Sequence, residues 1–290
     1  MSKPQHTEKH DDLIYDVGMH KGEDTDYYIK KGFRVIGFEA DPELVEQCRA
    51  RFAAEIENDR LTVVEGAIVE SPPGGSGNRT VKFYKNRDNR IWSTVSGEWA
   101  RRKESFGTSN EEIEVPVVNF PECLAKYGIP HYLKIDIEGM DLLCLEALSD
   151  SEQKPDYVSI ESEKVSFESL IRELDLLSQL GYREFKAIQQ KSVWRRKEPR
   201  ESSEGRHVGY QFQEGSSGLF GSDLPRKWKN YEQVVKEYRL IFLQYKLFGD
   251  YGTLSKHFAG RFLGNAISFL LHRPIPGWYD THAKHSSVIS

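Results

Sequence analysis

The sequence has few cysteines, and the three present, Cys48, Cys123 and Cys144, lie far apart. They form no Cys-x-x-Cys pair and no Cys/His spacing typical of zinc ligands, so neither a disulfide framework nor a zinc cage is expected. We therefore expect reduced, mostly buried thiols and no metal site.

Long hydrophobic runs and an excess of positive charge are also lacking. The longest apolar run, around Ala266 to Leu271, is far too short to span a bilayer. The first residues, MSKPQHTEKHDD, are polar and charged, unlike a signal peptide. A formal net charge of −5 argues against a protein that holds nucleic acid mainly by neutralising phosphates. These absences predict a cytoplasmic protein whose partner is neither a membrane nor a nucleic acid.

The sequence does contain alternating strand-like and helix-like segments over its first two thirds. The stretch LIYDVGMHKGEDTDYYIKKGFRVIGFEAD predicts a strand, a glycine turn, a helix over Thr25–Lys31 with Asp24 as its cap, and a second strand. A single helix over Glu43–Asn58 and a third strand, LTVVEGAI, follow. This alternation is typical of a parallel sheet covered by helices.

The chain divides into parts of different composition. We predict a flexible N-terminus at 1–12, a main domain at 13–194 with a strand-containing insertion at about 70–130, a flexible charged insertion at 195–207, and a C-terminal extension at 208–290 that packs on the domain. Within the first insertion, GEWARRKESFGTSNEE is expected to be a solvated excursion. From Tyr231 the apolar spacing predicts one long helix with an aromatic face, more consistent with packing on the sheet than with a ligand surface.

The glycine turn after the first strand is the most informative local feature. A dinucleotide fingerprint requires glycine at its first, third and sixth positions, which here are Gly18, His20 and Glu23. Acidic residues at the start of a helix also disfavour a pyrophosphate there. A phosphate-binding GxxxxGK[ST] loop is absent from the sequence. A ligand with a ribose but no phosphate therefore suits this turn better than a dinucleotide.

Three residues of this unit suggest how such a ligand is held. Gly18 lets the backbone approach the ligand, Glu39 accepts hydrogen bonds from two ribose hydroxyls, and Asp16 helps to hold an ammonium group or a water bound to it. S-adenosyl-L-methionine carries these groups, and its sulfonium cation is compatible with acidic surroundings. We therefore predict S-adenosyl-L-methionine as the cofactor.

Three segments resemble the FkbM-type S-adenosylmethionine-dependent methyltransferases: IYDVGMHKGEDT, VIGFEADP and YLKIDIEGMDLLCLEAL. The resemblance covers about residues 13–190. It implies the class I methyltransferase fold, an α/β Rossmann-like architecture with a seven-stranded, mostly parallel sheet, helices on both faces and an antiparallel last strand. The helical and aromatic C-terminal extension is added to this fold.

The resemblance also implies which residues bind the cofactor. They lie in the first motif, at the acid that contacts the ribose, at the turn that flanks the adenine and in the central signature, namely Asp16, Gly18, Gly22, Glu39, Ala40, Asp41, Glu65, Gly66, Ala67 and Asp136. The chain departs from the family at Met19 and His20, where an Ala-Asn pair is usual. We expect His20 to line the methionine moiety or the substrate, or simply to hydrogen-bond the turn.

Carboxylates at two neighbouring strand ends are the candidate catalytic groups. Asp136 and Glu138 end one strand and are expected to point the same way, as a coupled acid pair. Glu161 ends the next strand. A carboxylate close to an acceptor hydroxyl can take its proton, so Asp136, Glu138 and Glu161 are predicted to be catalytic. Alternatively, one acid holds the cofactor amine and another caps the following helix.

The resemblance implies O-methylation of a hydroxyl on a small molecule or sugar, and three other functions stay open. A dehydrogenase of the Tyr-x-x-x-Lys type would use Tyr27/Lys31 or Tyr182/Lys186. A metal-assisted methyltransferase would use the three catalytic carboxylates as ligands for Mg²⁺. A non-catalytic module would bind the cofactor for structure or regulation.

The C-terminal region, from about Arg206, is expected to contribute to the acceptor pocket. The glycine-rich stretch EGSSGLFGSD and the tail PIPGWYDTHAKH are interpreted as part of the pocket or its lid. The competing interpretation makes this region plain packing or the surface of a homodimer. If the tail is a lid, cutting the chain after Pro276 leaves the fold intact.

Overall fold

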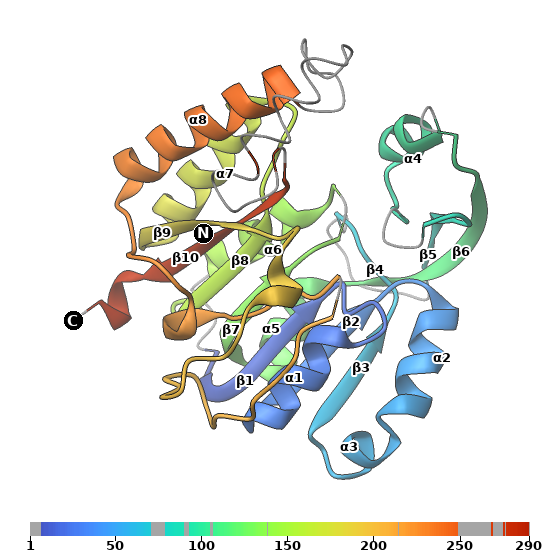
Figure 1. The fold of residues 1–290 in the computed structure, drawn as a ribbon. Helices are drawn as coiled ribbons and strands as arrows, with labels where there is room; N and C mark the ends of the chain where they lie inside the picture. The colour runs from blue at the N-terminus through green and yellow to red at the C-terminus, as the bar shows by residue number, and fades with distance from the viewer. Residues whose placement is uncertain are drawn as a thin grey trace.

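The structure is a computed structural model. It describes residues 7–70, 79–89, 93–104, 107–137, 139–213, 215–248, 268, 275 and 277–289. A seven-stranded sheet forms its centre, and a three-stranded sheet stands to one side (Figure 1).

The central sheet has the strand order β3-β2-β1-β7-β8-β10-β9. Its first five members in this order are parallel, and β10 pairs antiparallel with both β8 and β9. This arrangement confirms the predicted class I methyltransferase fold. The strands are β1 (Lys9–Val17), β2 (Arg34–Glu39), β3 (Leu61–Glu65), β7 (Ile129–Ile135), β8 (Tyr157–Glu161), β9 (Tyr182–Gln189) and β10 (Tyr279–His285).

Alternating side chains of the strands build a core on each face of this sheet. Along β1, Tyr15 and Val17 belong to one core and Ile14 to the other, as the two-residue period of a strand requires. The first core is covered by helices α5 (Phe120–Tyr127), α6 (Asp141–Ala147), α7 (Phe167–Gln179) and α8 (Tyr231–Phe248). The second is covered by α1 (Glu23–Lys31), α2 (Pro42–Arg51) and residues 208–224.

Helix α8 confirms the predicted long helix and its packing on the domain. Val234, Tyr238 and Ile241 are buried in the first core, and the aromatic ring of Phe242 meets that of Phe167 on α7. No helix in the described ranges is both long enough and apolar enough to cross a membrane. The apolar run at 266–271 lies outside the described residues, apart from residue 268. All three cysteines are free, and Cys48 and Cys144 are buried as predicted.

The structure corrects the sequence-based boundaries at three places. The predicted helix over Glu43–Asn58 is interrupted at Phe52 and continues as α3 (Ala53–Glu57). The predicted third strand ends at Gly66 (φ 132°), where an added Cβ would lie 2.5 Å from the Pro116 carbonyl oxygen. Asp24 does not cap α1, because its carboxylate accepts hydrogen bonds from backbone N–H groups of Ser217 and Gly218.

The second sheet is a lobe inserted between β3 and β7, with the order β4-β6-β5. Its strands are β4 (Ala67–Ile68), β5 (Thr80–Asn86) and β6 (Asn110–Val118). The segment predicted as a solvated excursion contains a further helix, α4 (Gly97–Glu104). We call the described residues from 79 to 118 the insertion lobe; Figure 1 shows it standing apart from helices α7 and α8.

The tail predicted as a lid is instead a strand of the central sheet. Residues 279–285 form β10, which lies between β8 and β9 and pairs with both. The side chains of Thr281 and Ala283 are fully buried there. The lid interpretation of the tail is therefore wrong, and with it the expectation that the fold survives a cut after Pro276.

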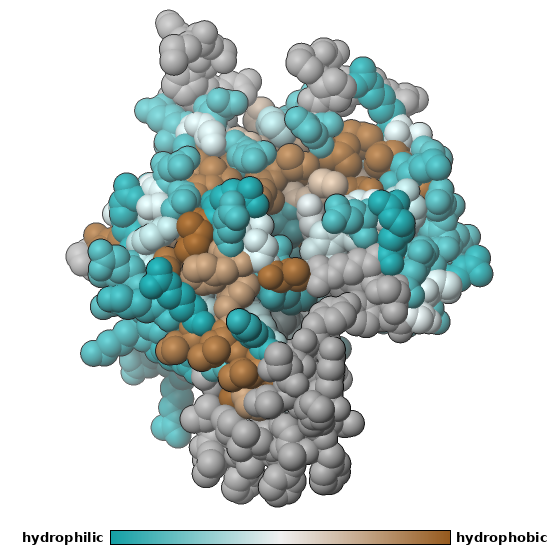
Figure 2. Space-filling model, turned by 90° about the horizontal axis from the view of Figure 1, so that it is seen from above, coloured by the Kyte–Doolittle hydropathy of each residue, from teal (hydrophilic) through white to brown (hydrophobic). Residues whose placement is uncertain are grey.

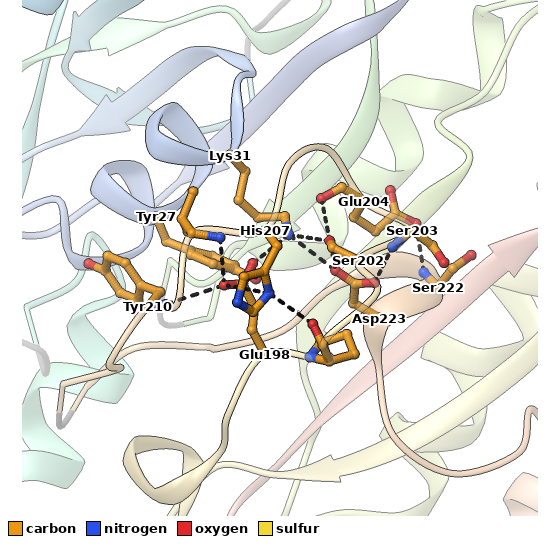
Figure 3. Close-up of polar contacts among 12 residues, drawn as sticks. Tyr27, Lys31, Glu198, Ser202, Ser203, Glu204, His207, Tyr210, Ser222 and Asp223 are labelled. Atoms are coloured by element: carbon orange, nitrogen blue, oxygen red, sulfur yellow. Dashed lines mark hydrogen bonds and ion pairs between the residues drawn. The ribbon is translucent and has the colours of Figure 1, made fainter.

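Residues 195–224, which we call the strap, cover the second core. We predicted a flexible insertion at 195–207, but Glu198 and Glu204 are only 8% and 4% exposed. The Lys31 ammonium on α1 donates hydrogen bonds to Glu198 (2.8 Å) and Asp223 (3.2 Å), as Figure 3 shows. Buried charges are tolerated when they are paired in this way, so the ion pairs attach the strap to α1.

The glycine-rich part of the strap also packs inward, although its Glu214 lies outside the described residues. Phe220 is fully buried, and its ring stacks on Tyr132 at 4.7 Å between centroids. This stretch therefore contributes to the core and is not a free lid.

A half-buried histidine links the strap to the sheet. His131 on β7 makes hydrogen bonds through Nδ1 to Asp156 and through Nε2 to Glu204, each 2.8 Å long. Burial lowers the pKa of His131, but these two carboxylates outweigh it and raise the pKa to about 9. The imidazolium therefore stays charged at neutral pH and links the strap residue Glu204 to the sheet.

This raised pKa predicts a pH-dependent contribution to stability. With an unfolded pKa of about 6.5, the contribution is complete below about pH 6.5 and is lost as the pH rises through 9. Its size is at most about 3 kcal/mol. Chemical denaturation should show the largest difference in unfolding free energy between wild type and His131→Gln at pH 6, shrinking by pH 9.5. A difference that does not change with pH would contradict this assignment.

Candidate active site

A cavity opens at the carboxyl ends of the parallel strands, where an open α/β sheet binds its ligands. It encloses about 900 Å³ of empty space, some of it open to solvent. Viewed from above, hydrophobic surface lies in the middle of the molecule between hydrophilic margins (Figure 2). The lining includes Gly18, Met19, His20, Glu39, Ala40, Gly66, Ala67, Lys134, Asp136, Met140 and Gly215, together with Phe83, Thr94 and Val95 of the insertion lobe.

Gly18 brings the ends of β1 and β7 together. Its φ is 82°, and a Cβ at this position would collide with the carbonyl oxygen of Asp136. Its N–H donates to the carbonyl oxygen of Phe38 on β2 (3.0 Å). Gly18 lines the cavity, as predicted, and the structure adds a second reason for glycine, the close approach of the neighbouring strand end.

Glu39 lies at the end of β2, with one carboxylate oxygen bonded to the glycine turn and the other to the backbone that follows β2. Its Oε2 accepts from the N–H of His20 (2.9 Å), and its Oε1 accepts from Ala40 (2.9 Å) and Asp41 (2.8 Å). Burial raises the pKa of Glu39 to about 7, although these N–H groups oppose the shift. Each carboxylate oxygen can accept more than one hydrogen bond, so Glu39 can still accept hydrogen bonds from the hydroxyl groups of a ligand in the cavity.

Both residues of the turn's Met-His pair line the cavity, and Met19 also belongs to the second core. Met19 is buried in the second core. His20 has a φ of 51° and lines the cavity, with its Nδ1 3.3 Å from the Glu23 carboxylate. The sequence left open whether His20 lines the ligand site or only hydrogen-bonds the turn. In the structure His20 lies in the turn and also lines the cavity.

Asp16 lies behind the cavity and does not line it. Its carboxylate accepts from the Thr25 hydroxyl (2.6 Å) and from the Lys134 ammonium (3.0 Å). Lys134 also donates to the Gly18 carbonyl oxygen (2.9 Å) and faces the cavity. The predicted direct contact between Asp16 and a ligand is therefore corrected: Asp16 positions Lys134, which the sequence analysis did not assign although it stands in the KIDIEG motif.

The electrostatics of the site depend on this buried lysine and the acids around it. Burial lowers the pKa of Lys134, but Asp16 and Asp136 raise it well above its usual value, so the ammonium stays charged. Burial raises the pKa of Asp136, while Lys134 lowers it and Glu161 raises it. Asp136 is thus a cavity carboxyl whose proton affinity is set by its neighbours, as expected of a group that exchanges protons.

Of the other predicted catalytic acids, the structure describes Glu161, which does not line this cavity. Glu161 ends β8, accepts a hydrogen bond from the Lys164 ammonium (2.9 Å), and lines a second, adjoining cavity. Glu138 lies outside the described residues, so its predicted pairing with Asp136 stays a prediction.

Three predicted cofactor residues have structural contacts and do not line the cavity. Gly22 is the N-cap of α1, Asp41 caps α2 by accepting from the Glu43 N–H (2.9 Å), and Glu65 pairs with Arg49 (2.9 Å). Sequence analysis also missed the insertion lobe as a wall of the site. No sequence signal marks its residues, because they reach the cavity only through the packing of the lobe.

The tyrosine–lysine pairs of the dehydrogenase alternative lie away from the cavity. Lys31 donates a hydrogen bond to Glu198 of the strap. The Tyr182 hydroxyl donates to the Pro155 carbonyl (3.0 Å), and Lys186 donates to the Leu224 carbonyl (2.8 Å). Neither pair can serve a ligand in this site, so that alternative is wrong. Within the described ranges, no group of three or more His, Cys, Asp or Glu residues is arranged to hold a metal ion.

Comparison with known proteins finds one family match. The Methyltransferase FkbM domain matches residues 16–184, more than half of the chain. No curated protein matches the sequence.

Among solved structures, precorrin-6y C5,15-methyltransferase from Geobacter metallireducens is 12% identical, with 63% of this chain and 70% of that chain covered and a TM-score of 0.33. Precorrin 8w decarboxylase from Methanobacterium thermoautotrophicum is 15% identical, with 71% and 79% covered and a TM-score of 0.34. Similarity this low carries no argument about function, and the fold follows from the strand order itself.

Proposed function

The chain belongs to the FkbM methyltransferase family, and on that premise we propose that it transfers a methyl group from S-adenosyl-L-methionine to a hydroxyl group of a small molecule or sugar. The observation that carries the proposal is the cavity at the carboxyl edge of the sheet, where Glu39 and Asp136 face the same space.

The residues that line this cavity fit the proposed cofactor. Glu39 would accept hydrogen bonds from the ribose hydroxyls, and Ala40 and Ala67 would lie along the adenine. Asp136 and Asp24 place negative charge in the same cavity, which favours a sulfonium cation and disfavours a pyrophosphate. When bound, S-adenosyl-L-methionine supplies an electrophilic methyl group.

The protein's own contribution is proton acceptance and alignment. The Asp136 carboxylate takes the proton of the acceptor hydroxyl as that oxygen becomes the nucleophile. Burial raises the pKa of Asp136, and Lys134, held between Asp16 and the Gly18 carbonyl, opposes that rise and so favours the carboxylate form. The insertion lobe covers the cavity with Phe83 and Val95 and excludes water from it.

Cofactor binding tests the proposal directly. Calorimetry should show binding of S-adenosyl-L-methionine and S-adenosylhomocysteine and none of NADH. Glu39→Gln should weaken both by roughly 10- to 100-fold, since a hydrogen bond to a charged group contributes roughly 1.5–3 kcal/mol. NADH binding, or an unchanged dissociation constant in folded Glu39→Gln, would contradict the proposal.

The pH dependence of the same measurement identifies Glu39 as the group responsible. Because hydroxyl donors bind the ionised carboxylate and the pKa of Glu39 is about 7, cofactor affinity should rise between pH 6 and 8 and then level off. Glu39→Gln should flatten this profile. Glu65→Gln is the matched control, because Glu65 also ends a strand of the sheet but pairs with Arg49 outside the cavity.

A further inference from the structure

A second cavity adjoins the first and is not used by the cofactor in the function proposed above. It lies between the insertion lobe, α6, the end of β8 and the start of α7. Met140 lines both cavities, so the two meet beside Asp136, which lines the first. A molecule in the second cavity would therefore present its hydroxyl next to the site of methyl transfer.

The second cavity is strongly acidic. Among the described residues, its lining has one basic side chain, Lys164, which donates a hydrogen bond to Glu161. The acidic side chains in its lining come from α6, from the end of β8 and the residues after it, and from α7. They are Asp141, Glu146, Glu161, Glu163 and Glu173. Uncompensated negative charge of this kind attracts a cation and repels phosphates and carboxylates.

One of these acids has an atom whose partner is missing. Glu173 on α7 is only 3% exposed, and its Oε1 has no hydrogen-bond partner among the described residues. The same carboxyl accepts a long hydrogen bond from the Glu163 N–H to Oε2 (3.4 Å) and one from the Thr281 hydroxyl. A buried carboxyl oxygen without a partner, as Oε1 is, is costly, and a ligand that donates a hydrogen bond to it removes that cost. Burial raises the pKa of Glu173 to about 8, as expected for a carboxyl that lacks a counter-charge.

An aromatic wall faces these acids. The Trp99 ring on α4 lies against Gly139, where an added Cβ would be 2.7 Å from the indole. Trp99 and Gly139 both line the second cavity. An indole face beside carboxylates suits an organic cation, because the ring itself attracts positive charge.

We propose that the second cavity binds a methyl acceptor that carries a primary ammonium group, held by Glu173 and Glu161 against Trp99. The inference rests on the proposed methyltransferase function and narrows its substrate class to amine-bearing hydroxyl compounds. Glu173 and Glu161 are positioning residues here, since they hold the amine and not the reacting oxygen.

The test uses the full chain saturated with S-adenosylhomocysteine and two probes of the same length, putrescine and 1,4-butanediol. Calorimetry at low ionic strength and pH 7.5 should show putrescine binding roughly 10- to 100-fold more tightly than the diol, the range for a charge-assisted hydrogen bond. Binding should also release protons from Glu173, seen as a heat that depends on the ionisation enthalpy of the buffer. Equal binding of the two probes would overturn the inference.

Variants locate the effect. Glu173→Gln should abolish both the preference for putrescine and the proton release, whereas Glu168→Gln, on the exposed face of the same helix, should change neither. If Glu173→Gln does not fold, Glu161→Gln should still reduce the preference. A preference unchanged in the folded variant would overturn the inference. Because binding of S-adenosylhomocysteine is measured first, its failure would count against the proposed function, and a missing diamine preference only against this inference.

Discussion

Ending the chain after Pro276 is expected to abolish folding. The cut removes β10, and with it the pairing partner of both β8 and β9 in the interior of the central sheet. The hydroxyl group of Thr281 on this strand also joins Ser162 and Tyr238 in a buried hydrogen-bond cluster. The free energy lost with such a strand should exceed the whole free energy of unfolding of a domain, which is about 5–15 kcal/mol.

Circular dichroism and cooperative denaturation should show this loss. The matched control is a chain that ends at His285, because it retains all of β10 and removes only the last short turn. We expect the control to unfold cooperatively and to bind S-adenosyl-L-methionine. A chain ending at Pro276 that folds and binds the cofactor would show that β10 does not hold the sheet together.

Asp136→Asn is expected to lower the methyl-transfer rate by about 10²- to 10⁴-fold, the range for loss of a general base. Cofactor affinity should fall less than the rate, because Asn keeps the shape of the side chain and Asp24 still places negative charge in the cavity. Turnover can be followed as release of S-adenosylhomocysteine in the presence of an amine-containing small-molecule extract. Equal losses of rate and cofactor affinity would make Asp136 a binding residue instead.

Two controls separate this role from the remaining alternatives. Asp59→Asn removes an exposed acid at a left-handed position that Asn tolerates, so its rate should match wild type. Activity should also survive exhaustive treatment with EDTA, whereas its restoration by Mg²⁺ would favour the metal-assisted alternative. A protein that binds cofactor but releases no product with any extract would be the non-catalytic module.

Local segments were predicted well where neighbouring residues decide the structure. The β1–turn–α1–β2 unit follows from one contiguous stretch, and Gly18 and Glu39 lie in the cavity as their positions in it suggest. The glycine pattern of that turn argued against a dinucleotide without any tertiary information, and this stays a prediction. Boundaries failed where a distant contact interfered, as at Asp24, which accepts hydrogen bonds from Ser217 and Gly218 instead of capping its helix.

The sequence by itself therefore determined the fold class, the family and the ligand turn, because these depend on periodicity and on short motifs. Only the tertiary structure decided the places of β10 and the strap. Many of their residues are polar, which is typical of exposed segments, yet Thr281 is buried by partners far away in the chain, and Glu198 pairs with Lys31. A polar side chain can be buried once its hydrogen bonds and charge are satisfied, and in a compact fold those partners come from segments that local patterns cannot connect.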